Sequence, residues 1–123
     1  MKKKVFIIED NEANIKLYKA IFKKIPNIEV FYETRGDKGL EMIKSGNPDL
    51  IILDNDLPKL KGIEICKELR KMDKFKEIPI IAASSSPVEG NRESIFARAG
   101  FNKSLSKPLN LKEFKEVIKE FLS

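Results

Sequence analysis

The amino-acid sequence predicts an α/β fold in which a five-stranded parallel sheet carries helices on both faces. Short apolar runs of strand length alternate with longer segments whose apolar residues recur with helical period. Three of the runs are continuously apolar, as expected for central parallel strands that are covered on both sides. A chain of 123 residues, 41% of them hydrophobic, can bury one core but is too short for two domains. We therefore expect one domain over residues 1–123, with no further domain after it.

The apolar runs predict five strands, at residues 5–8, 28–32, 50–53, 78–82 and 102–105. The first, third and fourth are the continuously apolar runs, so these strands should form the centre of the sheet. The runs at 28–32 and 102–105 contain polar residues and should form its two edges.

Helices are expected between these strands. The first should span residues 12–24 and end before Pro26. Its apolar stripe consists of Leu17, Tyr18, Ile21, Phe22 and Ile25. The second and third helices should span residues 36–45 and 63–72. In the third, apolar residues recur at spacing three, namely Ile63, Cys66 and Leu69, which makes the lone cysteine a core residue.

The last two helices differ in the clarity of their signals. The fourth should begin near Ser86, which has the character of an N-cap, but Gly90 follows within the first turns and weakens that start. The fifth has Asn110 and Glu113 at capping-box spacing. Its apolar face consists of Phe114, Val117, Ile118, Phe121 and Leu122.

The composition excludes several classes of function. The chain has no histidine and a single cysteine, which excludes zinc fingers, Ser-His-Asp hydrolases and an internal disulfide. The net charge is +5, yet apart from Lys2, Lys3 and Lys4 the basic residues alternate with acidic ones, so we do not expect nucleic acid as a partner. No apolar run approaches the length of a membrane span, and the free cysteine suits the reducing cytoplasm.

Polar clusters follow four of the five predicted strands. They are Glu9, Asp10 and Asn11; Asp54, Asn55 and Asp56; Ser84, Ser85 and Ser86; and Ser106, Lys107 and Pro108. In an open parallel sheet, ligands bind beyond the carboxyl ends of the strands, so all four clusters belong to the edge where a site is expected.

If the first and third strands are neighbours, the carboxylates of Glu9, Asp10 and Asp54 converge. Like charges at such close range need a compensating cation. Oxygen ligands without histidine or cysteine favour Mg²⁺, with Mn²⁺ as an alternative. Together with a hydroxyl group and Lys107, these groups suit phosphoryl transfer. The carboxylate that ends the central strand, Asp54, is best placed to be the nucleophile.

The chain resembles the receiver domains of two-component and phosphorelay response regulators over nearly its whole length. The resemblance rests on four motifs in order: Ile7-Ile8-Glu9-Asp10-Asn11; Ile51-Ile52-Leu53-Asp54 with Leu57-Pro58 and Gly62; Ile78-Pro79-Ile80-Ile81-Ala82 leading to Ser84; and Lys107-Pro108. It implies a flavodoxin-like fold with sheet order 2-1-3-4-5. It also implies a stand-alone receiver domain over residues 1–123 without an output domain.

The resemblance also implies a role for each site residue. Asp54 would accept a phosphoryl group from a histidine kinase or a histidine phosphotransfer protein. Mg²⁺ would be held by Asp10, Glu9, Asp54 and the backbone carbonyl of Asp56. Ser84 would hydrogen-bond a phosphoryl oxygen, and Lys107 would pair with the phosphoryl group after a cis peptide to Pro108. Such a domain catalyses only its own phosphorylation and dephosphorylation, and signals by binding a downstream protein as a monomer or weak dimer.

Two residues depart from the common receiver pattern. Ser104 stands where many receivers carry an aromatic switch residue, so the output must use another element; the start of the fourth helix is our candidate. Asp56, two residues after the nucleophile, adds a carboxylate. We expect its side chain to point to solvent; the alternative is that it affects the attack of water on the phosphorylated Asp54.

Two other functions are compatible with parts of the sequence. Asp54 and Asp56 form the Asp-x-Asp motif of haloacid-dehalogenase-like phosphatases, although in those enzymes the motif follows the first strand and the metal-binding acids come last. A phosphorylation-independent adaptor with a vestigial site is the second alternative, but it would not require the acids, Ser84 and Lys107 to be intact.

Overall fold

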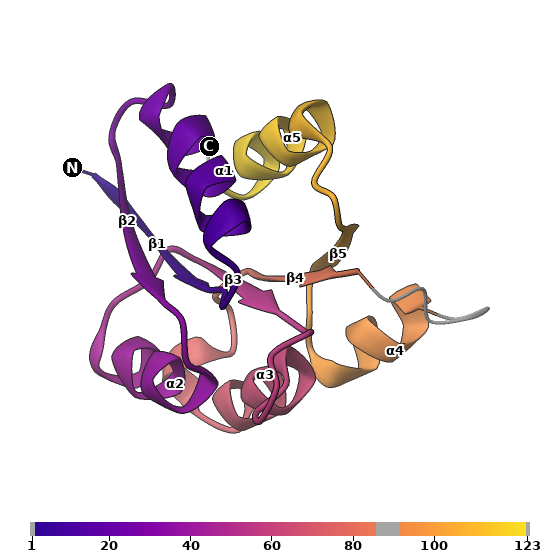
Figure 1. Cartoon of the computed structure of the whole chain (residues 1–123). Helices are drawn as coiled ribbons and strands as arrows, with labels where there is room; N and C mark the ends of the chain where they lie inside the picture. Colours follow the sequence, from indigo (N-terminus) through magenta and orange to yellow (C-terminus); the bar gives the residue numbers. More distant parts are fainter. Residues whose placement is uncertain (1, 86–91, 123) are drawn as a thin grey trace.

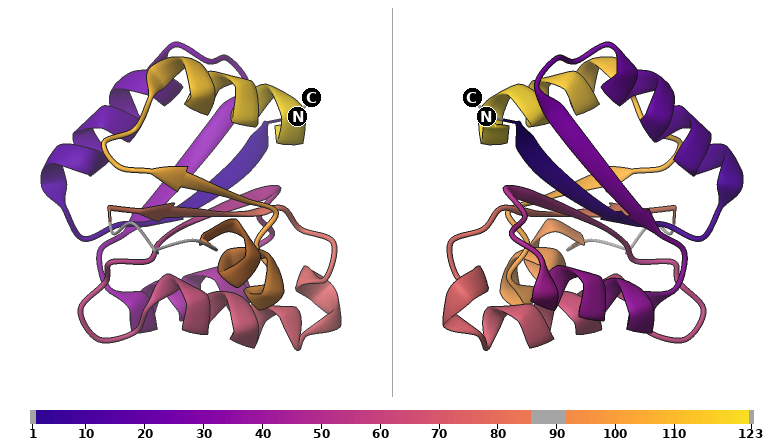
Figure 2. Two further views of the ribbon diagram at one scale, coloured as in Figure 1. Left: turned by 90° about the vertical axis from the view of Figure 1, so that its right-hand side faces the viewer. Right: turned by 90° about the vertical axis from the view of Figure 1, so that its left-hand side faces the viewer.

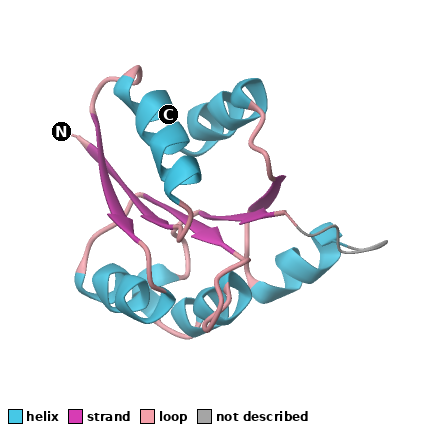
Figure 3. Cartoon of the chain, viewed as in Figure 1, coloured by secondary structure: helices cyan, strands magenta, loops and turns pink. Residues whose placement is uncertain are grey.

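The computed structural model describes residues 2–85 and 92–122. Five strands and five α-helices alternate along the chain. The strands are β1 (Lys3–Ile8), β2 (Ile28–Glu33), β3 (Leu50–Asp54), β4 (Ile80–Ser84) and β5 (Lys103–Ser106). The helices are α1 (Glu12–Lys23), α2 (Gly36–Ser45), α3 (Gly62–Arg70), α4 (Arg92–Ala99) and α5 (Leu111–Leu122), with a short 3₁₀ helix at Asp73–Phe75 (Figure 3).

The five strands form one parallel sheet in the order β2-β1-β3-β4-β5. This order confirms the prediction and places β2 and β5 at the edges. Helices α1 and α5 cover one face, and α2, α3 and α4 cover the other, which makes three layers (Figures 1 and 2).

Each face of the sheet has its own apolar core, because alternate side chains of a strand point to opposite faces. In β1, Val5 and Ile7 belong to the core under α1 and α5, whereas Phe6 and Ile8 belong to the core under α2, α3 and α4. Every residue of β3 and β4 is buried, as the continuously apolar runs predicted. Cys66 is a buried, free cysteine in the second of these cores, also as predicted.

Asparagine side chains cap α1 and α5 at their amino-terminal ends. Asn110 Oδ1 accepts a hydrogen bond of 3.0 Å from the backbone N–H of Glu113 at the start of α5. Asn11 Oδ1 accepts one of 3.1 Å from Asn14 at the start of α1. These bonds satisfy donors that a helix cannot pair internally.

Several predicted details were wrong. Leu17 is 37% exposed and therefore lies outside the buried stripe of α1, which is narrower than expected. β4 begins at Ile80, after Pro79, because proline has no backbone N–H to donate within a strand. In α3 the buried residues are Gly62, Ile65, Cys66 and Leu69, while Ile63 is only half-buried. The predicted cap at Ser86 and the weak first turn at Gly90 lie outside the described residues.

Candidate functional site

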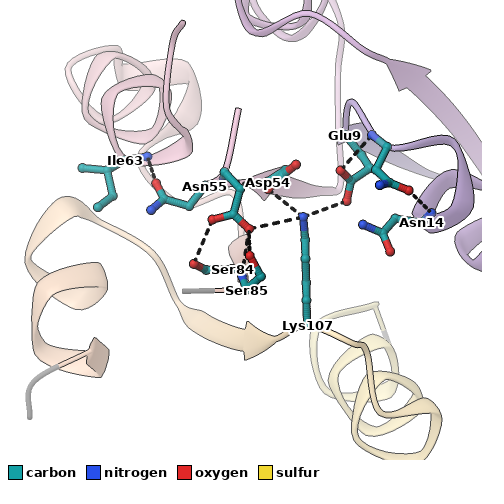
Figure 4. A network of polar contacts seen from close by, with 10 residues as sticks. Glu9, Asn14, Asp54, Asn55, Ile63, Ser84, Ser85 and Lys107 are labelled. Atoms are coloured by element: carbon teal, nitrogen blue, oxygen red, sulfur yellow. Dashed lines mark hydrogen bonds and ion pairs between the residues drawn. The ribbon is translucent and has the colours of Figure 1, made fainter. Parts of the chain in front are cut away.

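The polar clusters that follow β1, β3, β4 and β5 meet at the carboxyl-terminal edge of the sheet. β1 and β4 flank β3, and β5 lies beyond β4. This arrangement brings Glu9, Asp54, Ser84 and Lys107 into one network of polar contacts (Figure 4). Asp54 and Lys107 also line a cavity of about 400 Å³. Asp10, Asn11 and Asn14 line this cavity as well.

Three carboxylates are close together in this site. Glu9, Asp10 and Asp54 each offer one oxygen atom, and these atoms all lie within 4.8 Å of one another. Glu9 and Asp54 are buried, at 1% and 2% exposure, whereas Asp10 is exposed. At an effective dielectric of about 20, two unit charges at that distance repel by about 3.5 kcal/mol, so a cation is needed nearby.

Lys107 is the cation that the chain itself supplies. Its Nζ atom lies 2.8 Å from Asp54 Oδ1 and 3.2 Å from Glu9 Oε1. The side chain is only 11% exposed, and the backbone N–H of Lys107 donates a hydrogen bond of 3.0 Å to the carbonyl of Ser84. The following peptide bond, to Pro108, is cis, as the resemblance implied.

Burial and charge set the protonation of this group of residues. Burial, together with the neighbouring Asp54, raises the pKa of Glu9 to about 7. Burial also acts to raise the pKa of Asp54, but its contacts with Glu9 and Lys107 and the hydrogen bond from the backbone N–H of Asp56 outweigh it and leave the pKa lowered. Burial acts to lower the pKa of Lys107, but its contacts with Asp54 and Glu9 raise it. Asp54 is therefore ionised and Lys107 charged at neutral pH.

The two oxygens of Asp54 have different surroundings. Oδ1 accepts a hydrogen bond of 2.7 Å from the backbone N–H of Asp56 and pairs with Lys107. Oδ2 is buried and accepts no hydrogen bond from any residue that the structure describes. Because an unpaired buried oxygen is costly, Oδ2 is suited to a cation that Glu9 and Asp10 would share.

The loop after β3 is held by contacts that the sequence did not reveal. Asn55 Oδ1 accepts a hydrogen bond of 2.9 Å from the backbone N–H of Ile63, in the first turn of α3. A Cβ atom on Gly62 would lie 3.1 Å from the carbonyl oxygen of Asp54 and 3.2 Å from the Cα of Asn55. Glycine at this position thus lets α3 approach the residue that ends β3.

The expectation that the Asp56 side chain points to solvent was wrong. Asp56 Oδ2 accepts hydrogen bonds of 2.8 Å from both the backbone N–H and the Oγ of Ser85, and Oδ1 accepts one of 3.3 Å from Ser84 Oγ. Oδ2 also lies 3.6 Å from Lys107 Nζ. Burial acts to raise the pKa of Asp56, but the bonds from Ser85 and the charge of Lys107 lower it. Three donors at the end of β4 thus turn the side chain inward.

Residues 5–119 match the family described as "Response regulator receiver domain". The chain belongs to this family. The receiver assignment explains why the acids, the serine and the lysine are collected at one edge of the sheet.

One curated protein and two solved structures are similar to the chain over nearly its whole length. The chain is 34% identical over 122 residues to the polar-differentiation response regulator DivK of Brucella anthropi, covering 99% of this chain and 98% of that protein. The phosphorylated cyanobacterial phytochrome response regulator RcpA has a similar structure, with a TM-score of 0.83, 28% identity and coverage of 100% and 96%. The receiver domain of the Pseudomonas aeruginosa sensor histidine kinase PA1611 superposes with a TM-score of 0.86 at 24% identity, with coverage of 99% and 98%.

The receiver of this chain departs from the common pattern at the two residues noted in the sequence. Ser104 pairs with Ala82 across the sheet and is half-buried, so no aromatic side chain occupies that position of β5. Asp56 accepts hydrogen bonds from Ser84, the last residue of β4, and from Ser85, which follows it.

Among the residues that the structure describes, no helix combines the length and the apolar character that a membrane span needs.

Proposed function

We propose that this chain is a single-domain response regulator whose Asp54 accepts a phosphoryl group, with Mg²⁺, from a histidine kinase or a histidine phosphotransfer protein. One observation carries the proposal: Asp54 ends the central strand β3, 2.8 Å from Lys107 Nζ and within 4.8 Å of the carboxylates of Glu9 and Asp10. Matching relatives of nearly the same length, such as DivK of B. anthropi, support a receiver that works alone.

The residues present suit a hard divalent cation. Glu9, Asp10 and Asp54 supply carboxylate oxygens, and the backbone carbonyl of Asp56 would complete the protein's share of the ligands. The unpaired buried oxygen Asp54 Oδ2 supports this assignment. When bound, Mg²⁺ or Mn²⁺ neutralises negative charge on the transferring group. The PA1611 receiver, which has the same fold, is described with a magnesium ion coordinated in its active site cleft.

The transfer itself needs few groups from the chain. An oxygen of the ionised Asp54 carboxylate attacks phosphorus, an O–P bond forms, and the P–N bond to the donor's histidine breaks. Lys107 is charged and near enough to pair with the transferred group, and Ser84 can donate its hydroxyl hydrogen to a phosphoryl oxygen. In this proposal the chain catalyses only its own phosphorylation and, with water as the acceptor, its own dephosphorylation.

The signal would pass through contact with another protein. We infer a cytoplasmic protein, monomeric or weakly dimeric, that docks to a sensor kinase or phosphotransfer protein and, once phosphorylated, to a downstream target. A role in nucleic-acid binding is not part of the proposal, because the basic residues do not gather with aromatic ones.

The receiver family assignment favours this function over a haloacid-dehalogenase-like phosphatase that uses Asp54 and Asp56. The ion pairs that hold Lys107 against Asp54 and Glu9 favour it over a phosphorylation-independent adaptor, which would not need them.

Intact mass measured after incubation with acetyl phosphate and Mg²⁺ tests the proposal, with Asp54→Ala as the matched control. We expect the mass of one phosphoryl group to be added to the wild type, to require the metal, and to be absent from the variant. No adduct and no release of inorganic phosphate would support the adaptor. Continuous phosphate release that depends on Asp54, without a detectable adduct, would support the phosphatase.

A further inference from the structure

A groove of about 600 Å³ lies at the amino-terminal edge of the sheet. The parallel strands begin at this edge and end at the acidic site, so the groove and the site are at opposite ends of the molecule. The starts of β1 and β2, the turn after α1 and one face of α5 form its walls. Figure 2 shows the carboxyl-terminal end of α5 beside the amino-terminal end of β1 at this place.

The floor of the groove is apolar. It is formed by Ile25, Ile28, Ile118 and Leu122. Ile118 is buried, and the other three are half-buried, so they present apolar surface inside the groove. On α5, Ile118 and Leu122 lie four residues apart and so share one face of the helix.

The rim of the groove is basic. Lys3, Lys24, Lys115 and Lys119 line it, and none of the described residues that line it is acidic. All four are exposed, and within the described part of the chain Lys3, Lys24 and Lys115 form no ion pair. A helix carboxyl-terminus attracts cations, which accounts for Lys24 at the end of α1. It does not account for Lys3, at the start of β1, or for Lys115, in the first half of α5.

We propose that this groove binds an acidic, amphipathic segment of a partner protein. The partner's apolar side chains would contact the isoleucine and leucine floor, and its carboxylates would pair with the lysines of the rim. The complementary charge is what selects the partner, because four exposed lysines line the groove. The proposal does not depend on the chemistry at Asp54.

Two other classes of partner suit the groove less well. Among the residues that the structure describes, none that lines the groove is aromatic, so these residues offer no surface on which nucleic-acid bases could stack. Its apolar residues form a recessed floor between lysines, whereas a membrane-binding surface presents apolar side chains that can enter the lipid.

The probe for the test is a synthetic peptide of about 14 residues with leucine on one helical face and glutamate elsewhere. A scrambled peptide of the same composition, whose leucines share no face, is its control. Binding is measured by fluorescence anisotropy at about 50 and about 300 mM salt. The binding surface is mapped by backbone NMR shifts of the unphosphorylated full chain. Lys24→Glu/Lys115→Glu removes the rim charge, and Lys38→Glu/Lys59→Glu makes the same change of net charge at two exposed lysines outside the groove.

We expect the amphipathic peptide to bind more tightly than the scrambled one, less tightly at higher salt, and with shifts at Lys3, residues 24–28 and residues 115–122. The groove double variant should weaken binding about tenfold, and the control double variant less than twofold. Equal effects of the two double variants would overturn the proposal. So would shifts that map elsewhere, or tighter binding to phosphatidylserine vesicles or duplex DNA than to the peptide.

Discussion

Replacing Lys107 with methionine removes the cation that the structure places between two buried carboxylates. Lys107 Nζ lies 2.8 Å from Asp54 Oδ1 and 3.2 Å from Glu9 Oε1, and both carboxylate side chains are 1% exposed. Removing one partner of a buried ion pair costs about 3–5 kcal/mol of folding free energy. Glu9 can limit that loss by binding a proton, since its pKa is already raised to about 7 by burial and by Asp54. We therefore expect Lys107→Met to lower the free energy of unfolding by about 2–3 kcal/mol.

Urea denaturation at pH 7.5, with and without Mg²⁺, measures this loss. Lys103→Met is the matched control, because Lys103 is an exposed lysine at the start of β5, the strand that Lys107 follows. We expect the control to change stability by less than about 0.5 kcal/mol. Mg²⁺ should restore part of the stability of Lys107→Met and stabilise it more than the wild type, because the cation replaces the missing positive charge. A loss from Lys107→Met no larger than that of the control, or equal stabilisation of both proteins by Mg²⁺, would refute the reasoning.

Three further predictions concern single side chains. Asp56→Asn removes a negative charge beside Asp54 and weakens the hydrogen bonds with Ser84 and Ser85. Phosphorylation by acetyl phosphate, followed by intact mass, should therefore become faster. An unchanged or slower rate would contradict this prediction. Phe114 is fully buried, so Phe114→Ala should lower the free energy of unfolding in urea by about 3–5 kcal/mol, and a cost below about 2 kcal/mol would be inconsistent with its position. Burial raises the pKa of the Cys66 thiol to about 11 from an ordinary value near 9, so its contribution to stability is fully present below about pH 9 and is lost as the pH rises towards 11. The free energy of unfolding of the wild type should therefore fall more steeply than that of Cys66→Ala between about pH 9 and 11. Parallel dependence of the two proteins on pH would disprove the raised pKa of the Cys66 thiol.

The sheet could be predicted from the sequence because its central strands are covered on both faces. The runs that form β1, β3 and β4 had to be apolar throughout. This distinguishes them from strands that are buried on one face only, in which apolar and polar residues alternate. The helical stripes were less certain, since the width of the buried face depends on what packs against it. Leu17 has the spacing of a core residue and is nevertheless 37% exposed.

The sequence predicted which residues converge in the candidate site, but it did not predict all of their contacts. The carboxyl ends of neighbouring parallel strands meet at one edge, so the convergence of Glu9, Asp10, Asp54 and Lys107 follows from the order of the strands. The direction of the Asp56 side chain does not follow from that order. It is set by the N–H and hydroxyl donors of Ser84 and Ser85, which only the folded loop brings within reach. The hydrogen bond from Ile63 to Asn55 likewise joins residues whose proximity depends on the path of the loop.

The site at which the phosphoryl group is attached decides whether Asp54 is the phosphoacceptor. The protein is phosphorylated with acetyl phosphate and Mg²⁺, the acyl phosphate is reduced with borohydride, and the modified residue is identified by peptide mass spectrometry. We expect the reduced residue to be Asp54 alone, because Asp54 is ionised and paired with Lys107 at the end of the central strand. Modification of Asp10, Asp56 or Glu9 in the wild type would contradict this expectation.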